Sequence, residues 1–512
     1  MSEGDRILAE LITVLGEENV SNDPAIRVPY SRDQTSSAFT KFRYPDYVVL
    51  PESTEEVQRV VSIANRFKIT IIPWTTGANV AGKTIPIEGG IQMDLKKMNK
   101  ILEIDEDTMT ATVQPYVPMG RLQVEAKKRG FRIDIPGAPS SVGVISNYCT
   151  TFGMHFHSNK YGWGAEKIVG LEMVLPTGEI LRTGYLALKE YGAKNVAANG
   201  LGMDLSGVPY NSLGTLGVVT QMTVKMFPIR QEKKIIFATF SKVENGIKAY
   251  AEVAREELGI GLGAAGPAFW TTSLPFATRE EALGFLKQNH PMGILVWAEI
   301  EGTLNQIAYQ EDKVRNIFRK FKGDFTVGDI LSKTITTPDE ELASLIEPLN
   351  NLFKVNLNPY WLRRSKTMFD VSETPCRAFL LRGGLLMREV HNTFQNYLKQ
   401  YAFWKKTLKK HGYQGLDDGL WSMFISSYGA SDLVCELDLL WDPQDKVSKS
   451  IKSAANKELL PEYLKLGSYH LDAHSDEWDT IGPHYGFQYT LLKRMKGVFD
   501  PNNIMHRGEL YP

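Results

Sequence analysis

Apolar residues recur along the chain at two spacings, one typical of amphipathic helices and one of short buried strands. The helical spacing predicts a helix over residues 5–16, with an apolar face of Ile7, Leu8, Leu11, Ile12 and Leu15. A second helix is predicted to begin at a capping-box pattern, Ser53 with Glu56. The apolar runs 47–51 and 69–73 flank this second helix, so the segment is predicted to form a β-α-β unit.

Further along, shorter runs suit antiparallel sheets joined by a few helices. In the first half, the predicted strands are 91–95, 101–105, 109–114, 171–175, 180–183 and 222–227, with a helix from Pro118 to about Arg129. In the second half, strands are predicted at 234–240, 293–299, 378–381, 421–427 and 433–441, and helices at 243–258, 305–321 and 387–410. The second half is therefore predicted to be an antiparallel sheet covered by helices.

Composition narrows the class of protein. A chain of 512 residues suits two or three domains, and a net charge of −1 gives no general attraction to nucleic acid. Three widely spaced cysteines argue against a disulfide framework. The acidic start of the sequence is unlike a signal peptide, and no apolar run is long enough to span a membrane. We therefore expect a soluble cytoplasmic protein that binds no nucleic acid and does not span a membrane.

A small, polar loop follows the apolar run 69–73 and extends to Gly82. Its backbone N–H groups, with its Thr and Asn side chains, can hold an anion such as a diphosphate, or the loop can be an ordinary connection. Residues 77–84 also match the P-loop pattern GxxxxGK[ST]. A P-loop must open a helix, however, and residues 85–90 contain Pro and Gly-Gly instead of a helix start, which argues against an NTPase.

Two further segments place glycine where the backbone can approach a ligand, and a hairpin pattern lies between them. Residues 136–147 form a loop of small residues bounded by Pro, 171–183 a hairpin pattern, and 211–220 a glycine-bearing lead into a strand. In this order, with Asp500-Pro501 near the end, these segments resemble the FAD-dependent oxidoreductases of the vanillyl-alcohol oxidase and p-cresol methylhydroxylase (PCMH) superfamily. The resemblance covers about residues 45 to 228 and 465 to 512.

This resemblance implies an α+β fold in three parts. Residues 1–228 would be a PCMH-type FAD-binding domain of two subdomains, 229–465 a cap domain, and 466–512 a segment that returns to the first domain. The first loop holds the FAD pyrophosphate by backbone donors in this superfamily, which makes Lys83 a bystander. The implied FAD-binding residues are Pro73, Thr75, Thr76, Gly77, Ala78, Asn79, Val80, Pro139, Ser140, Ser141, Gly143, Ser146, Asn147, Gly153 and Val219.

Some positions depart from the family pattern or leave two interpretations. Trp74 stands where Arg is usual, and the first loop contains no His, which excludes the histidyl–flavin link that some relatives form there. His155 and His157 alternate, so on a strand they would face one side, either as a metal pair or as ordinary polar residues. Cys149 is either a site of flavin attachment or a small buried residue. We expect no bound metal.

Near the end of the chain, Tyr469 and His470 match the place of a Tyr-Arg pair that binds the phenolate oxygen in the 4-alkylphenol-oxidising branch. The resemblance implies that both donate hydrogen bonds to a developing oxyanion, and His470 is also a candidate base. Packing of the C-terminal segment is the alternative, as is a metal pair of His470 with His474. Arg507 is a candidate for a cation near the flavin.

The predicted activity is FAD-dependent removal of a hydride by an oxidase or dehydrogenase. Tyr469 favours a 4-alkylphenol or aryl alcohol, although Trp163 stands where that branch has an acidic residue. Arg363 and Arg364, which either bind a carboxylate or anchor a surface loop, favour a 2-hydroxy acid instead. A redox-neutral flavoenzyme like alkyl-glycerone-phosphate synthase is a third alternative. We expect a small-molecule substrate, an electron acceptor such as oxygen, a cytochrome or another redox protein, and a homo-oligomer such as a dimer.

Overall fold

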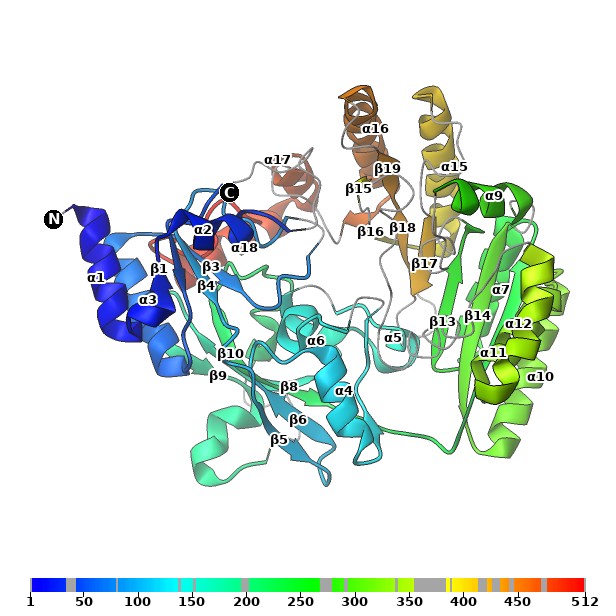
Figure 1. Cartoon of the computed structure of the whole chain (residues 1–512), viewed down its shortest axis with the longest axis horizontal. Coiled ribbons are helices and arrows are strands. Elements are labelled where there is room, and N and C mark those ends of the chain that lie inside the picture. Colours follow the sequence, from blue (N-terminus) through cyan, green and yellow to red (C-terminus); the bar gives the residue numbers. More distant parts are fainter. Residues whose placement is uncertain are drawn as a thin grey trace.

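The computed structural model describes fifteen segments, and every structural statement concerns these: 2–33, 43–79, 82–136, 140–150, 153–194, 202–267, 279–289, 293–336, 339–353, 384–386, 389–412, 421–425, 433–441, 446–470 and 477–510. Within them the fold is α+β, with a small mixed sheet and a larger antiparallel one toward the N-terminus and a second large antiparallel sheet in the cap (Figure 1). None of the described helices combines the length and apolar character that crossing a lipid bilayer requires.

The small sheet contains the predicted β-α-β unit. Its strands lie in the order β1-β2-β4-β3, with β2 and β3 parallel to β4. The bounds are α1 (Glu3–Leu15), β1 (Val20–Ser21), α2 (Pro24–Arg27), β2 (Tyr47–Val49), α3 (Thr54–Phe67), β3 (Ile71–Trp74) and β4 (Ile91–Asp94). Helix α3 begins as predicted, because the Ser53 side chain accepts from the N–H of Glu56. The Glu56 carboxylate caps the N–H of Glu52 and not that of Ser53, so the capping box is only half formed.

The second sheet is antiparallel, in the order β5-β6-β10-β8-β9. Its strands are β5 (Ile101–Asp105), β6 (Thr110–Val113), β8 (Ile168–Val174), β9 (Ile180–Arg182) and β10 (Val218–Lys225). Around it lie α4 (Met119–Lys127), β7 (Phe131–Arg132), α5 (Ser158–Tyr161), α6 (Gly164–Lys167) and β11 (Phe227–Pro228). Val174 and Val218 from this sheet are part of the core of the small sheet, so the two sheets pack against each other.

The cap contains the largest sheet in the described residues, in the antiparallel order β12-β14-β13-β17-β18-β16-β20. The strands are β12 (Glu232–Phe240), β13 (Gly261–Ala265), β14 (Ile294–Gly302), β16 (Glu389–Asn392), β17 (Trp421–Ile425), β18 (Leu433–Leu437) and β20 (Tyr469–His470). A separate ribbon pairs β15 (Gly384–Leu386) with β19 (Leu439–Trp441). The predicted antiparallel cap sheet is therefore present, with β13, β16 and β20 as strands that the hydrophobic pattern did not reveal.

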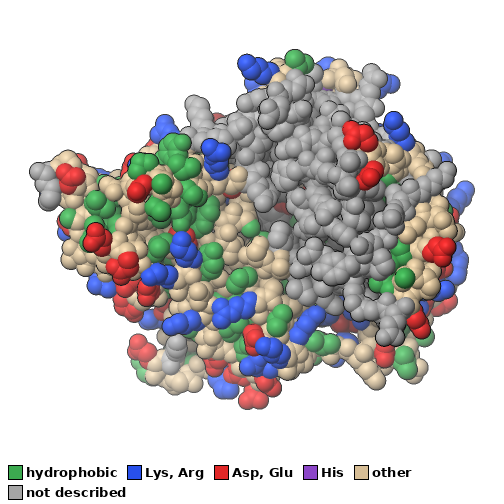
Figure 2. Space-filling view, viewed as in Figure 1, with side chains coloured by type: hydrophobic (Ala, Val, Ile, Leu, Met, Phe, Trp, Pro, Cys, Tyr) green, Lys and Arg blue, Asp and Glu red, His purple; other side chains and the backbone are tan. Residues whose placement is uncertain are grey.

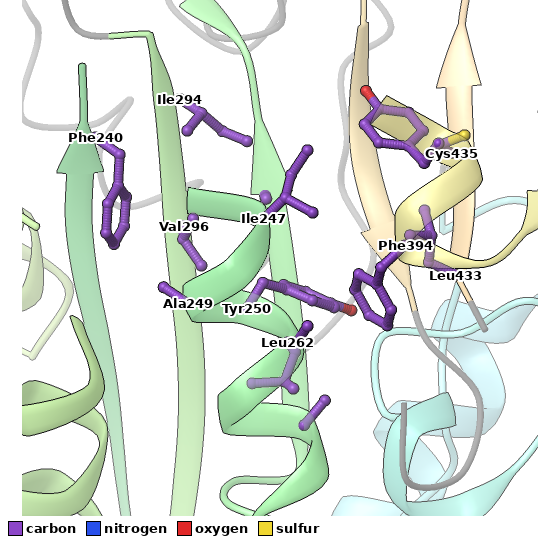
Figure 3. Close-up of a cluster of buried hydrophobic side chains, with 14 of the residues drawn as sticks. Phe240, Ile247, Ala249, Tyr250, Leu262, Ile294, Val296, Phe394, Leu433 and Cys435 are labelled. Carbon is purple, nitrogen blue, oxygen red and sulfur yellow. The ribbon is translucent and has the colours of Figure 1, made fainter. Parts of the chain in front are cut away.

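Helices cover the cap sheet as predicted (Figure 1). They are α7 (Val243–Arg255), α9 (Arg279–Asn289), α10 (Leu304–Lys320), α11 (Thr326–Thr336), α12 (Asp339–Phe353), α15 (Phe394–Lys410) and α16 (Lys446–Lys465). Figure 3 shows how side chains from α7 and α15 meet over the strands, with the rings of Tyr250 and Phe394 5.6 Å apart. The helix predicted over 387–410 begins later, because residues 389–392 pair with β18 and Thr393 caps α15. The strand predicted over 378–381 lies outside the described residues.

The C-terminal segment first contributes to the cap and then returns to the small sheet. Strand β20 pairs with β16 in the cap, whereas α17 (Trp478–Ile481) and α18 (Phe487–Phe499) lead back toward β3. There Ile71 donates to Ile504, and His506 donates to Ile71. The buried ammonium of Lys496 anchors this return by donating to the carbonyl oxygens of Thr215 and Met505.

The division of the chain into domains at residues 228 and 465 stays a prediction. On the face seen in Figure 2, hydrophobic side chains gather near α2.

Candidate functional site

The first predicted loop follows β3 and folds back over Trp74, the last residue of that strand. Gly77 has φ of +68°, and a Cβ there would lie 2.3 Å from the ring of Trp74, so only glycine fits beneath this ring. The Trp74 ring in turn packs edge-on against Tyr30. Residues 82–90 form turns and not a helix, and the buried Lys83 ammonium lies 3.5 Å from Glu509. Because a P-loop requires a helix start there, this geometry excludes an NTPase-type phosphate site.

The second predicted loop lies against the first. Residues 140–144 run beside the start of α4, where Gly120 donates to Ser140, Met119 to Val142, and Val144 back to Val117. The N–H of Gly143 donates to the hydroxyl of Thr76 at 3.2 Å, which joins the two loops directly.

Hydroxyl groups of Thr75, Thr76 and Ser146 gather around Gly143. The Ser146 hydroxyl donates to the Gly143 carbonyl, and a Cβ added at Gly143 would lie 2.9 Å from that hydroxyl and 3.6 Å from the one of Thr75. The missing side chain at Gly143 therefore leaves the two loops free to approach each other.

Two further predicted segments converge on these loops. Asn211 donates to the carbonyl of Cys149, and a Cβ at Gly214 would lie 3.3 Å from the ring of Pro73. Val219 on β10 is buried in the same hydrophobic cluster as Val144, Ile145, Tyr148 and Cys149. The structure thus brings Pro73, Thr76, Gly143 and Val219 into one region. Val80 and Pro139 lie outside the described residues.

His506, which the sequence analysis did not single out, lies at the same junction. Its Nδ1–H donates to the carbonyl of Leu213 at 3.0 Å, so its Nε2 is an acceptor. This Nε2 atom is buried and has no hydrogen-bond partner among the described residues. Burial lowers the pKa of His506, in keeping with a neutral ring. Sequence reasoning missed this contact, because it joins residues 293 positions apart.

A cluster of buried charges lies behind the second loop. Lys167 on α6 donates to Asp134 at 2.5 Å and to His155 Nδ1 at 2.7 Å, and His155 Nε2 contacts the side-chain oxygen of Asn147 at 2.7 Å. His157 lies 3.3 Å from Asp134 and 3.2 Å from Glu299 on β14. The two histidines lie in irregular backbone and a turn, not on a strand, and both lie near Asp134, although their Nε2 atoms face different partners.

The charges in this cluster shift one another's pKa values. Burial alone would raise the pKa of Asp134, but Lys167 and the two histidines hold it well below its usual value. Burial would also raise the pKa of Glu299, but Lys233 and His157 lower it to about 2. Burial and Lys167 together lower the pKa of His155, whereas Glu299 and Asp134 raise that of His157 despite its burial.

The histidine and cysteine alternatives can be placed on this geometry. No group of three or more His, Cys, Asp or Glu side chains among the described residues is arranged to hold a metal ion. Cys149 is fully buried among apolar side chains, and burial raises the pKa of its thiol. This environment disfavours the thiolate, so the small buried residue is the interpretation that the structure favours.

For the predicted catalytic residues Tyr469 and His470, the structure describes the backbone. In β20, Tyr469 stands opposite His391, and His470 opposite Val390. The side chains of Tyr469 and His470 are outside the described part of the structure, as are His474 and the two arginines Arg363 and Arg364.

Arg507 is described, and other groups already hold it. Its guanidinium donates to the carbonyls of Lys68 and Asn503 and lies 3.3 Å from Glu88. A role beside the flavin stays a prediction for Arg507.

His391 and Trp163 connect the edge of the cap sheet to the second loop. Their rings meet edge-on, with centroids 5.6 Å apart. Trp163 precedes Gly164, which packs so closely on Gly153 that a Cβ at Gly153 would lie 2.4 Å from the Gly164 Cα. The strand that carries Tyr469 therefore lies near Gly153. The sequence analysis missed His391 because it placed this residue in a helix.

The donors in this region fit the predicted FAD. The joined loops offer backbone N–H groups and the hydroxyls of Thr75, Thr76 and Ser146, which suits a pyrophosphate held by neutral donors. The free acceptor of His506 suits a hydroxyl or amino donor of a nucleotide. The nearby apolar cluster around Val144 and Val219 suits the flat rings at the ends of the cofactor.

Comparison with known proteins agrees with this assignment. Residues 45–184 match a family described as an FAD binding domain. Glycolate oxidase subunit GlcD of Bacillus subtilis is 35% identical over 48% of this chain and 49% of its own length. A probable mitochondrial D-lactate dehydrogenase of Danio rerio is 28% identical over 49% of this chain and 48% of its own length. Alkyldihydroxyacetonephosphate synthase of Dictyostelium discoideum is 27% identical over 42% of this chain and 34% of its own length. The chain thus spans about half or less of the length of these relatives.

Solved structures resemble the chain over its whole length. p-Cresol methylhydroxylase with substrate bound gives a TM-score of 0.80 at 22% identity, covering 100% of this chain and 98% of its own. 4-Ethylphenol oxidase from Gulosibacter chungangensis, in an isoeugenol complex, gives 0.78 at 20% identity with the same coverage. At this identity the likeness shows the fold. Residues 45–184 show that the chain carries an FAD-binding domain, so its cofactor is FAD, and the sequence relatives and the fold together support a PCMH-type FAD-binding oxidoreductase.

Proposed function

We propose that this protein oxidises a 4-alkylphenol or aryl alcohol by removing a hydride from a C–H bond of the substrate. The observation that supports this proposal is the likeness of fold over the whole chain, cap included, to p-cresol methylhydroxylase and 4-ethylphenol oxidase. The cap matters because the substrate pocket of the superfamily lies beneath it. Phenol-oxidising relatives therefore share the part of the fold that would surround the substrate.

Each group has a separate task in this proposal. The FAD supplies the redox chemistry by accepting the hydride. The joined loops at Thr76 and Gly143 hold the cofactor, and Tyr469 with His470 donates hydrogen bonds to the substrate oxygen as negative charge develops there. His391 stands opposite Tyr469, and residues so paired have Cβ atoms about 4.5–5.5 Å apart, so it is a further candidate for this oxygen.

A 2-hydroxy acid is the second candidate substrate. The relatives named as glycolate oxidase subunit and D-lactate dehydrogenase favour it, because they share sequence and not only fold with this chain. Their alignments cover about half of the chain. This evidence therefore carries less weight for the substrate than for the cofactor.

Purification and anaerobic reduction test the proposal. The protein should carry a flavin absorbance band near about 450 nm. A panel of 4-alkylphenols and aryl alcohols should bleach this band, whereas glycolate and D-lactate should not. Bleaching by the hydroxy acids alone would refute the phenol assignment and support the second candidate. Product formation with no electron acceptor present would point to a redox-neutral flavoenzyme.

A substitution then tests the role of Tyr469. The Tyr469→Phe variant should slow flavin bleaching by a phenol at least about 100-fold, because removal of one oxyanion donor typically costs that factor or more. Tyr309→Phe, at an exposed site on α10, is the matched control and should reduce as fast as wild type. If a phenol bleaches the flavin of both variants at the same rate, Tyr469 has no part in the mechanism.

We also propose the cytoplasm as the location and a homo-oligomer such as a dimer as the assembly. The small number of cysteines supports the location. Oxygen, a cytochrome or another redox protein is the proposed electron acceptor, and stopped-flow reoxidation with each would identify it.

A further inference from the structure

Helix α18, which leads the C-terminal segment back to the small sheet, exposes a stripe of apolar side chains. Its members recur at intervals of four, four and three residues, so they share one face of the helix. Single exposed apolar side chains are common on protein surfaces, but a row along a whole helix marks an interaction surface. The apolar stripe consists of Phe487, Leu491, Met495 and Val498, which are 67%, 45%, 38% and 78% exposed.

The opposite face of α18 is attached to the rest of the protein. The buried ammonium of Lys496 donates to the carbonyl oxygens of Thr215 and Met505. The hydroxyl of Tyr489 donates to the carbonyl of Leu510. The helix could turn its apolar stripe inward only by breaking these bonds, so the stripe is held facing outward.

The charges on α18 itself are all positive. Its sequence contains two lysines, one arginine and no acidic residue. Lys493 and Arg494 are exposed, whereas Lys496 is turned inward. The Arg494 guanidinium lies 5.6 Å from the centre of the Phe487 ring and forms no ion pair with a described residue. An arginine beside apolar side chains can reach a lipid phosphate while its stem stays among them.

A second copy of the chain fits the apolar stripe poorly. A helix of 13 residues is about 20 Å long and about 10 Å wide, so one face covers about 200 Å². A stable protein–protein interface usually buries about 800 Å² on each partner. Two copies packed stripe to stripe would also bring two Arg494 side chains of the same charge together. An anionic lipid surface needs no large area of matched shape, and it attracts cations.

We propose that α18 docks the protein on the surface of an anionic membrane. The apolar stripe would lie among the lipid headgroups, and Arg494 would contact their phosphates. A helix of this kind lies in the plane of the interface, with its apolar face about 5–10 Å deep. The docking does not depend on which substrate the enzyme oxidises, so it goes beyond the proposed function.

Co-sedimentation of the purified holoenzyme with lipid vesicles tests the proposal. We expect binding to phosphatidylcholine vesicles that contain about 30% phosphatidylserine at about 50 mM salt, and much weaker binding at about 500 mM salt. Phe487→Ser combined with Val498→Ser should weaken the binding at least about tenfold. Arg494→Gln should weaken it about fivefold, which corresponds to about 1 kcal/mol, and should not change binding to vesicles of phosphatidylcholine alone.

Leu304→Ser is the matched control. Leu304, on α10 of the cap, is also 67% exposed but lies outside the apolar stripe, so its replacement should leave vesicle binding unchanged. The substituted side chains are all exposed, and each variant should therefore keep its flavin absorbance and its unfolding midpoint.

Three results would overturn the proposal. The first is wild-type protein that stays in solution beside the anionic vesicles at low salt. The second is vesicle binding that the paired Ser substitution weakens no more than Leu304→Ser does. The third is a wild-type dimer, detected by light scattering, that the paired Ser substitution converts to a monomer, because the apolar stripe would then be an interface between copies of the chain.

Discussion

Replacement of Lys167 by methionine is the sharpest test of the buried cluster. The ammonium is 0% exposed and lies 2.5 Å from Asp134 and 2.7 Å from His155. Removal of one partner leaves a buried carboxylate uncompensated, which costs about 3–5 kcal/mol. Asp134 keeps His157 at 3.3 Å and the backbone N–H of Ile135, so we expect the lower end, about 3 kcal/mol.

Urea unfolding of the holoenzyme, followed by tryptophan fluorescence, measures this loss. Lys248→Met is the matched control, because it removes an exposed ion pair with Glu244 one turn away on α7 and should change nothing measurable. Adding Asp134→Asn to the Lys167 variant should recover part of the stability, since no buried charge is then left unpaired. If Lys167→Met were as stable as the control variant, the account of this cluster as a tightly paired charge network would be wrong.

Two further predictions concern the same region. Asp134 and Glu299 raise the pKa of His157 above its ordinary value of 6.5, so the stability that His157 contributes is complete below that pH and is lost as the pH rises through the folded-state pKa. Unfolding midpoints measured between about pH 5 and 9 should show this loss, and His157→Gln should remove it. Gly153→Ala should unfold the site and release FAD, because the new methyl group would lie 2.4 Å from the backbone of α6. Gly192→Ala has a similar positive φ but nothing within 4 Å, so it should keep its flavin and lose only about 1–2 kcal/mol.

Local signals in the sequence predicted the N-terminal sheets well. Ser53 caps α3, Pro118 stands at the start of α4, and Gly178 takes the positive φ that the predicted hairpin turn requires. These signals act between residues close in sequence, so they can be recognised without the rest of the fold. The resemblance assigned both of the first two loops to FAD, and the bond from Gly143 to Thr76 places these loops side by side.

The cap was harder to predict because its strands depend on distant partners. Strand β13 has the sequence Gly-Leu-Gly-Ala-Ala, and neither Gly nor Ala favours a strand. Its glycine is required by a neighbour, since a Cβ at Gly263 would lie 2.0 Å from the ring of Trp297 on β14. The hydrophobic pattern could not indicate β16 for a similar reason. Residues 389–392 become a strand by pairing with β18, although they precede a strong helix.

The two alternating histidines show how one wrong local assumption changes a functional interpretation. On a strand, His155 and His157 would face the same side, which is why a metal pair was an alternative. Gly153 has φ of +61°, and residues 153–157 form irregular backbone and a turn instead of a strand. The two rings meet at Asp134, with Nε2 of His155 toward Asn147 and Nε2 of His157 toward Glu299 in the cap. The residue that determines this arrangement is Asp134, about twenty positions earlier in the chain, whose carboxylate lies near both rings. A carboxylate shared in this way suits two histidines with different protonation states, and it therefore favours ordinary buried polar residues over a metal pair.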